Sequence, residues 1–309
     1  MKAAMLYDVE EVYSQSIMTK MPIIIVEGVD DVPLYDRICN SKSKRASVFA
    51  VETLEGFGQG CISLIKAMDK VKGLPESKFD PQDFIAGMID KDVRDFRGEI
   101  PRNDLVFVLR HYSIESHFVF PDILESLLAY STRTTSDLRS PALISSIADC
   151  VGRSFEVLYL ASLEALKGAL DPTYFSDVSY SYPYGRVKDL ALIKKIKQKE
   201  ADLLNFAELH GLQFDLHSLR MMSRGKWLLS VFCEEVERAI LELPASCKAG
   251  AVAKCQFCVA VAHEQCLYKL KDGISGKNLK IFAMQHTDMP SFDYIRSKVD
   301  SMYEAVHGL

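Results

Sequence analysis

Apolar residues in the first third of the chain form short unbroken runs, separated by segments with helical spacing. The runs that predict buried strands are 22–26, 46–51, 84–89 and 105–109. The segments that predict helices are 30–39, 61–71 and one that begins near 114. Unbroken apolar strands that alternate with helices are typical of a mainly parallel sheet covered on both faces. We therefore expect an α/β fold here.

Beyond residue 120 the pattern changes to long stretches with apolar residues every three or four positions, including "KCQFCVAVAHEQCLYKL". These stretches predict a mostly helical region. The segment 171–186 is rich in tyrosine and turn formers and predicts a loop or a hairpin. We place the boundary within 125–145, with an α/β domain over 20–125 and a helical region over 126–309.

Composition narrows the function classes. The 309 residues carry a net charge of −5, so binding to nucleic acid would need a local basic patch or metal ions. No apolar run reaches the roughly 18 residues that span a bilayer, and the N-terminus lacks a signal-peptide core. We expect a cytoplasmic protein without membrane segments. Its eight cysteines would then be reduced thiols rather than a disulfide framework.

Acidic residues follow the predicted strands. Glu27 ends the first, Asp90 and Asp92 follow the third, and Glu115 comes soon after the fourth. Together with Asp31, they would meet at the carboxyl edge of a parallel sheet. Adjacent carboxylates repel, and a hard divalent cation relieves that repulsion. The pattern predicts a site for Mg²⁺, or for Mn²⁺ in its place.

Each of these residues also has a structural interpretation. A single acid after a strand is often a solvated loop residue or a turn former. Asp30 is interpreted as the N-cap of the following helix, and Ser113 as the N-cap of the helix that carries Glu115. Lys91, between the two aspartates, is a possible counter-ion.

The acid pattern resembles the Toprim fold of topoisomerases, primases and OLD-type nucleases. The glutamate in "IIIVEG" and the D-x-D in "GMIDKD" match that family, and "EGVDD" and "RHYSIESHF" match its OLD-like nuclease branch. "SRGKWLLSVF" supplies a downstream lysine, Lys226, in a glycine-lysine context of the right kind. The resemblance implies that Glu27 and Asp31 serve one side of a metal pair and that Asp90 and Asp92 bridge it or serve the other. Glu115 would complete the shell or act as base, and Lys226 would neutralise charge on the phosphate.

The chain resembles the stand-alone effector nucleases of PARIS anti-phage systems in its length and in its lack of a phosphate-binding G-x-x-x-x-G-K-[ST] loop. That resemblance implies a toxin-like, metal-dependent endonuclease that cleaves RNA, with tRNA as the expected substrate. It also implies an ABC-type ATPase partner and an active homodimer. The alternatives are an OLD-type DNA nuclease or nickase, a non-catalytic partner-binding protein with a decayed Toprim domain, and a phosphatase or primase-like transferase.

Three further patterns carry hypotheses. The basic stretch at 186–199 is either a solvated helix face or a phosphate-binding surface. The candidate phosphate-binding residues are Arg186, Lys188, Lys194, Lys195 and Lys197. The nearby tyrosines either stack bases or pack the loop. Apolar positions such as Leu228, Leu229, Val231 and Phe232 are candidates for a partner surface. Cys255, Cys258, His263 and Cys266 have near zinc-knuckle spacing, although the cysteines also fit one helical face as small hydrophobes.

Overall fold

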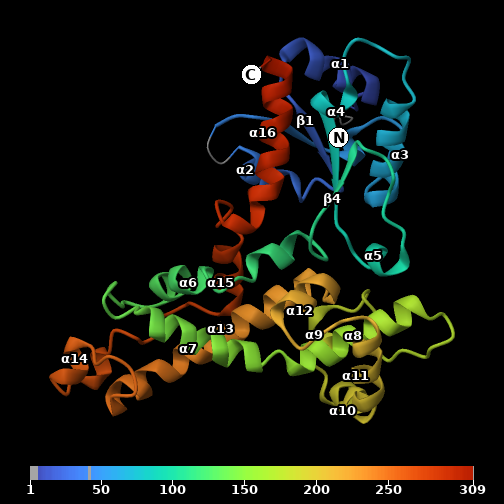
Figure 1. The fold of residues 1–309 in the computed structure, drawn as a ribbon. Coiled ribbons are helices and arrows are strands. Elements are labelled where there is room, and N and C mark those ends of the chain that lie inside the picture. The colour runs from blue at the N-terminus through green and yellow to red at the C-terminus, as the bar shows by residue number, and fades with distance from the viewer. Residues whose placement is uncertain (1–5, 41–42, 309) are drawn as a thin grey trace, which may run out of the picture. The chain divides into compact units, whose positions relative to one another are not determined.

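The computed structural model describes residues 6–40 and 43–308, which divide into two compact units (Figure 1). We call them the sheet unit, residues 6–110 with 287–308, and the helical unit, residues 111–286. This division differs from the predicted domains of 20–125 and 126–309. The chain's last helix returns to the sheet unit, which a linear reading of the sequence does not reveal.

Four parallel strands form the sheet, as predicted. They are β1 (Ile23–Val26), β2 (Ser47–Ala50), β3 (Ile85–Ile89) and β4 (Val106–Val108), in the order β2-β1-β3-β4. Each lies within two residues of its predicted range, because unbroken β-branched runs are specific for buried parallel strands. The chain passes from β1 to β2 on one side of β1, and then crosses to β3 on the other side of β1. The direction of winding therefore changes between β1 and β3, which makes this position a topological switch point.

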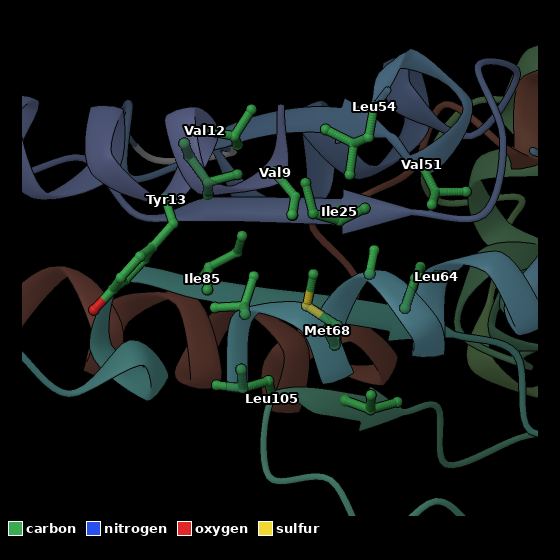
Figure 2. Close-up of a cluster of buried hydrophobic side chains, with 14 of the residues drawn as sticks. Val9, Val12, Tyr13, Ile25, Val51, Leu54, Leu64, Met68, Ile85 and Leu105 are labelled. Carbon is green, nitrogen blue, oxygen red and sulfur yellow. The ribbon is translucent and has the colours of Figure 1, made fainter. Parts of the chain in front are cut away.

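Helices cover both faces of the sheet. Figure 2 shows side chains of α1 (Val9–Thr19) and α3 (Cys61–Lys72) packed on one face, where Ile25 and Ile85 contribute from β1 and β3. Figure 1 shows α2 (Val32–Cys39) and the C-terminal helix α16 (Asp293–His307) on the opposite face. Successive strand residues therefore point into two different cores, which explains why the strands are apolar throughout.

The sequence interpretation missed α1. Its start is well defined: the Asp8 side chain accepts a hydrogen bond from the backbone of Glu10, and Glu11 completes a capping box. Val9, Val12 and Tyr13 are buried in the sheet core. The remaining short elements of this unit are η1 (Val51–Thr53), α4 (Pro81–Phe84), α5 (Arg94–Arg97) and η4 (Pro290–Phe292).

The helical unit is built around α13 (Gly225–Ala249), which is 25 residues long. Its other elements are η2 (Ile114–Phe118), α6 (Ile123–Ser131), α7 (Pro141–Arg153), α8 (Glu156–Leu170), α9 (Tyr184–Val187), α10 (Leu190–Gln198), α11 (Glu200–Leu209), α12 (Leu216–Met222), α14 (Gln256–Val259), η3 (His263–Gln265) and α15 (Gly276–Ala283). The prediction of a helical region is confirmed. Within the described ranges, no helix is both long enough and apolar enough to cross a bilayer.

Two details of the predicted helical region are wrong. Leu228, Leu229 and Phe232 are buried in the unit's own core and Val231 is half-buried, so this stretch of α13 is not an open partner surface. The segment after residue 254 is not a long helix but the single turn α14, the short η3 and connecting turns. The segment 171–186 is a loop that leads into α9, in agreement with one of the two predicted alternatives.

Candidate functional site

The carboxyl ends of β1 and β3 meet through a side chain. Glu27 follows β1, and its Oε1 accepts a hydrogen bond of 3.0 Å from the backbone N–H of Asp90, which follows β3. The contact spans the switch point, which is where open α/β sheets bind ligands. The prediction that strand ends bring these two acids together is therefore met by the fold.

The surroundings of Glu27 are unfavourable for its negative charge. Burial raises the pKa of the Glu27 carboxyl, and the backbone N–H of Asp90 opposes that rise. The negative charges of Asp92 and Asp31 raise the pKa further, while Arg94 lowers it. Asp92 and Asp31 are therefore close enough to Glu27 to disfavour its ionised form, which is the repulsion that the sequence pattern predicts.

Arg94 is the counter-charge that the sequence interpretation missed. Its Nη1 lies 2.7 Å from Oδ2 of Asp92, and its Nη2 contacts the thiol of Cys61 at 2.7 Å. Lys91, the counter-ion proposed from the sequence, pairs instead with Asp95 at 2.6 Å. Arg94 is the first residue of α5, and Asp92, two residues earlier, has a positive φ of 50°. In the sequence, the only sign of this pairing is a basic residue two positions after the D-x-D motif.

Asp31 rather than Asp30 occupies the N-cap position of α2 and makes no capping hydrogen bond with its side chain. Its carboxylate instead contributes to the raised pKa of Glu27. Tyr35, one turn along α2, is also close to this edge. Burial raises the pKa of the Tyr35 hydroxyl well above its usual value, and the charge of Asp90 adds to the effect.

The glycine-rich segment 55–60 lies beside the acidic edge. The backbone N–H of Gly60 donates to the carbonyl of Glu27 at 2.8 Å. Gln59 lies directly over Gly28, where an added Cβ would approach its Nε2 to 2.6 Å. The lack of a side chain at Gly28 leaves room for the Gln59 amide in this position.

The carboxylates are neighbours but are not gathered around one point. Among the residues that the structure describes, only four cysteines form a group of three or more potential ligands whose ligand atoms lie within 4.8 Å of one another. At the sheet edge, Glu27 is engaged with a backbone N–H and Asp92 with Arg94. The oxygen donors suit Mg²⁺ chemically, but in this conformation a guanidinium supplies the positive charge.

Glu115 was predicted at the same edge but belongs to the helical unit. It is buried on η2, and its Oε2 accepts a hydrogen bond of 2.6 Å from the hydroxyl of Ser113. Ser113 precedes η2 but makes no capping hydrogen bond, which corrects its predicted role. The serine holds the glutamate instead.

Lys226 lies in the first turn of α13, next to the segment that carries Glu115. A Cβ on Gly225 would approach Oγ of Ser113 to 2.1 Å and Cβ of Glu115 to 3.1 Å, so only glycine permits this contact. The Lys226 side chain is exposed and has no ion-pair partner among the described residues. A lysine at a helix N-terminus is electrostatically disfavoured, so its position needs a reason other than helix stability.

Most of the predicted phosphate-binding residues have partners within the helical unit. Arg186 pairs with Asp189 at 3.2 Å, Lys188 with Glu234 at 2.6 Å and Lys195 with Asp177 at 3.3 Å. In the described part of the chain, only Lys194 and Lys197 of the predicted set are exposed and make no ion pair. The candidate surface is therefore smaller than predicted.

The neighbouring tyrosines pack the loop. The hydroxyl of Tyr174 donates to the buried Glu164 at 2.6 Å, and that of Tyr184 donates to Glu234 at 2.7 Å. The Tyr180 ring stacks on Trp227 at 5.8 Å between centroids. Of the two predicted roles, packing is the one that these contacts support.

No profile of a known protein family matches the sequence, and no curated protein is significantly similar to it. The chemistry of the two units therefore rests on their own geometry and on the motif resemblance.

Proposed function

We propose that this protein is a metal-dependent endonuclease of the OLD-like Toprim type, resembling AriB, the effector nuclease of PARIS anti-phage systems. Its substrate would be RNA, with tRNA favoured, and its metal Mg²⁺ or Mn²⁺. An ABC-type ATPase would restrain it, and a homodimer would be the active form. The observation that carries the proposal is the Glu27 carboxylate at the β1–β3 switch point, bonded to the backbone of Asp90 and close to Asp31 and Asp92.

The energetic reasoning starts from the raised pKa of Glu27. A half-buried carboxylate beside two aspartates costs free energy in the isolated fold, because burial and like charges both disfavour its ionised form. Carboxylates whose pKa is shifted in this way are frequent at functional sites. A divalent cation bound here would offset this cost and would supply the activated water and charge neutralisation that phosphodiester hydrolysis needs.

The chain's own residues have distinct tasks in this proposal. Glu27, Asp31, Asp90 and Asp92 provide hard oxygen donors from the ends of two adjacent strands. Arg94 holds Asp92 until a cation competes for that carboxylate. In the helical unit, the start of α13, which carries the exposed Lys226, packs closely at Gly225 against the segment that carries Glu115, and the lysine is available for a phosphate.

The direct test is cleavage of tRNA and of supercoiled plasmid with Mg²⁺, comparing wild type with Glu27→Gln. Cleavage of tRNA that the variant lacks supports the proposal. Cleavage of plasmid alone supports the DNA nuclease. If neither substrate is cleaved with Mg²⁺ or Mn²⁺, in a preparation separated from any co-purifying ATPase, the proposal fails.

The Arg94–Asp92 ion pair favours a second candidate, a non-catalytic binding protein whose acidic edge is neutralised internally. In that case the edge has no need of a cation. Mg²⁺ would then leave the melting temperature unchanged, whereas a metal that binds the folded site raises it.

A further inference from the structure

Four cysteines that are scattered in sequence converge in the helical unit. The Sγ atoms of Cys247, Cys255, Cys258 and Cys266 all lie within 4.8 Å of one another, and all four residues are buried. Cys247 comes from the last turn of α13, Cys255 and Cys258 from the start and body of α14, and Cys266 from the end of η3. His263, which the sequence placed among the ligands, is not in the cluster, and Cys247 takes its place.

One sulfur–sulfur distance in the cluster matches a single tetrahedral ion, and the other pairs lie within 4.8 Å. Zn²⁺ bonds thiolate sulfur at about 2.3 Å, which puts the sulfurs of a tetrahedral site about 3.8 Å apart. The Sγ atoms of Cys255 and Cys266 are 3.9 Å apart. A disulfide needs about 2.05 Å, and all four cysteines are free thiols. A multi-iron cluster would place several metal ions between the sulfurs and hold them farther apart than this.

The burial pattern around the cysteines is inverted relative to an ordinary core. Between residues 250 and 270 the buried side chains are those of Cys255, Cys258, Cys266 and Tyr268. Apolar side chains in the same segment face outward: Val259 is 67% exposed and Val261 is 74% exposed. Free cysteine is often buried in ordinary cores, but here the four buried sulfurs also converge within 4.8 Å of one another, while the valines of the same segment face solvent. The segment is organised around sulfur.

Backbone N–H groups are directed at these sulfurs. The N–H of Cys255 donates to Sγ of Cys247 at 3.3 Å. The N–H groups of Cys258 and Leu267 interact with Sγ of Cys255, and that of Tyr268 interacts with Sγ of Cys266. Hydrogen bonds of this kind stabilise thiolates, the form in which cysteine binds metal.

We propose that Cys247, Cys255, Cys258 and Cys266 bind one structural Zn²⁺ in a closed tetrahedral thiolate site. Binding converts four thiols to thiolates with release of four protons, so the loaded site has a net charge of −2. The ion would fix the end of α13 to the segment 251–271. That segment is joined to the start of the unit by the N–H of Arg133, which donates to the carbonyl of Leu267 at 3.0 Å, and by Tyr268, whose hydroxyl donates to the carbonyl of Leu138 at 3.2 Å.

The test is the metal content of the full chain, purified without affinity-tag metal and measured by elemental analysis. We expect about one zinc ion per chain in wild type. Cys247→Ser and Cys258→Ser should each lose most of it. His263→Ala tests the alternative ligand set predicted from the sequence, and Cys150→Ser is a control cysteine outside the cluster; both should keep the zinc. Zinc well below stoichiometry in wild type, or iron in its place, would overturn the proposal, as would loss of zinc on His263→Ala with retention on Cys247→Ser.

If the cysteine variants fail to fold, the proposal is tested on the wild-type protein alone. Titration of folded wild type with a mercurial reagent should release the zinc in step with modification of about four thiols. Substitution by Co²⁺ should give the intense absorption of tetrahedral cobalt thiolate. Release without thiol modification, or an octahedral cobalt spectrum, would contradict a tetrathiolate site. None of these readouts depends on nuclease activity.

Discussion

The acidic edge of the sheet unit and the cysteine cluster of the helical unit are both suited to a metal, yet their geometries are opposite. The acids are hard oxygen donors and partly open, and one of them, Asp92, is paired with Arg94. The cysteines are soft donors, buried, and gathered within 4.8 Å before any ion is considered. Structural zinc sites are closed, whereas sites for chemistry keep positions open for water and substrate. The difference fits the two proposals made above, a fixed structural ion in the helical unit and an exchangeable one at the acidic edge.

The largest expected effect tests the open site. Glu27→Gln should keep the fold and reduce cleavage at least about 100-fold, corresponding to about 2.7 kcal/mol of lost transition-state stabilisation. It removes one negative charge and almost no volume. Single-turnover cleavage beside circular dichroism measures both parts. Normal cleavage by a folded variant would mean that the acidic edge is not the site.

The second prediction separates the two sites. Cys258→Ser should lower the melting temperature by several degrees, since about 1 kcal/mol corresponds to roughly 2–4 °C for a unit of this size. Glu27→Gln should keep its zinc and lose the Mg²⁺-induced thermal shift. A folded Cys258→Ser protein should show the reverse. Loss of both metal responses in both variants would mean that the two sites are not independent.

The third prediction concerns the internal counter-charge. Arg94→Ala should destabilise the metal-free protein, because Asp92 and Glu27 lose their guanidinium. It should also increase the thermal shift caused by Mg²⁺, because the cation no longer competes with Arg94. Lys91→Ala is the matched control, since Lys91 pairs with Asp95. An equal Mg²⁺ response in all three proteins would show that Arg94 does not compete with the metal.

Sequence patterns predicted the strands and the meeting of Glu27 with Asp90 because both depend on local rules: unbroken apolar runs form parallel strands, whose carboxyl ends share an edge. The pairing of Arg94 with Asp92 depends on a turn at a positive φ, which composition does not reveal. Cys247 was missed because it lies in the last turn of α13, outside the stretch 255–266 that has zinc-knuckle spacing, and the fold brings its sulfur to the other three. The packing of α16 within the sheet unit likewise depends on the tertiary fold and not on local sequence.

A smaller effect follows from the raised pKa of Glu27. An acid with a raised folded-state pKa stabilises the fold at low pH, and this contribution is lost as the pH rises from the unfolded to the folded pKa. Glu27→Gln should therefore match wild type in stability near pH 4 and exceed it near pH 7. Mg²⁺ should reduce the difference at pH 7 by stabilising wild type alone. Chemical denaturation at both pH values measures it, and a variant less stable than wild type at pH 7 would contradict the burial of a charged Glu27.

The smallest expected effect concerns the basic stretch of the helical unit. Lys194 and Lys197 are exposed without ion pairs among the described residues, so each can release one counterion on contact with a phosphate. The double change to glutamine should weaken tRNA binding modestly and reduce the slope of log affinity against log salt by about 2. Lys188→Gln with Lys195→Gln is the matched control, because these lysines already pair with Glu234 and Asp177. The control should change the slope less, since a lysine held by a carboxylate contributes less to a phosphate. Equal slopes for wild type and both variants would support the alternative interpretation, in which this stretch is a solvated helix face. The nucleic acid would then bind to another surface.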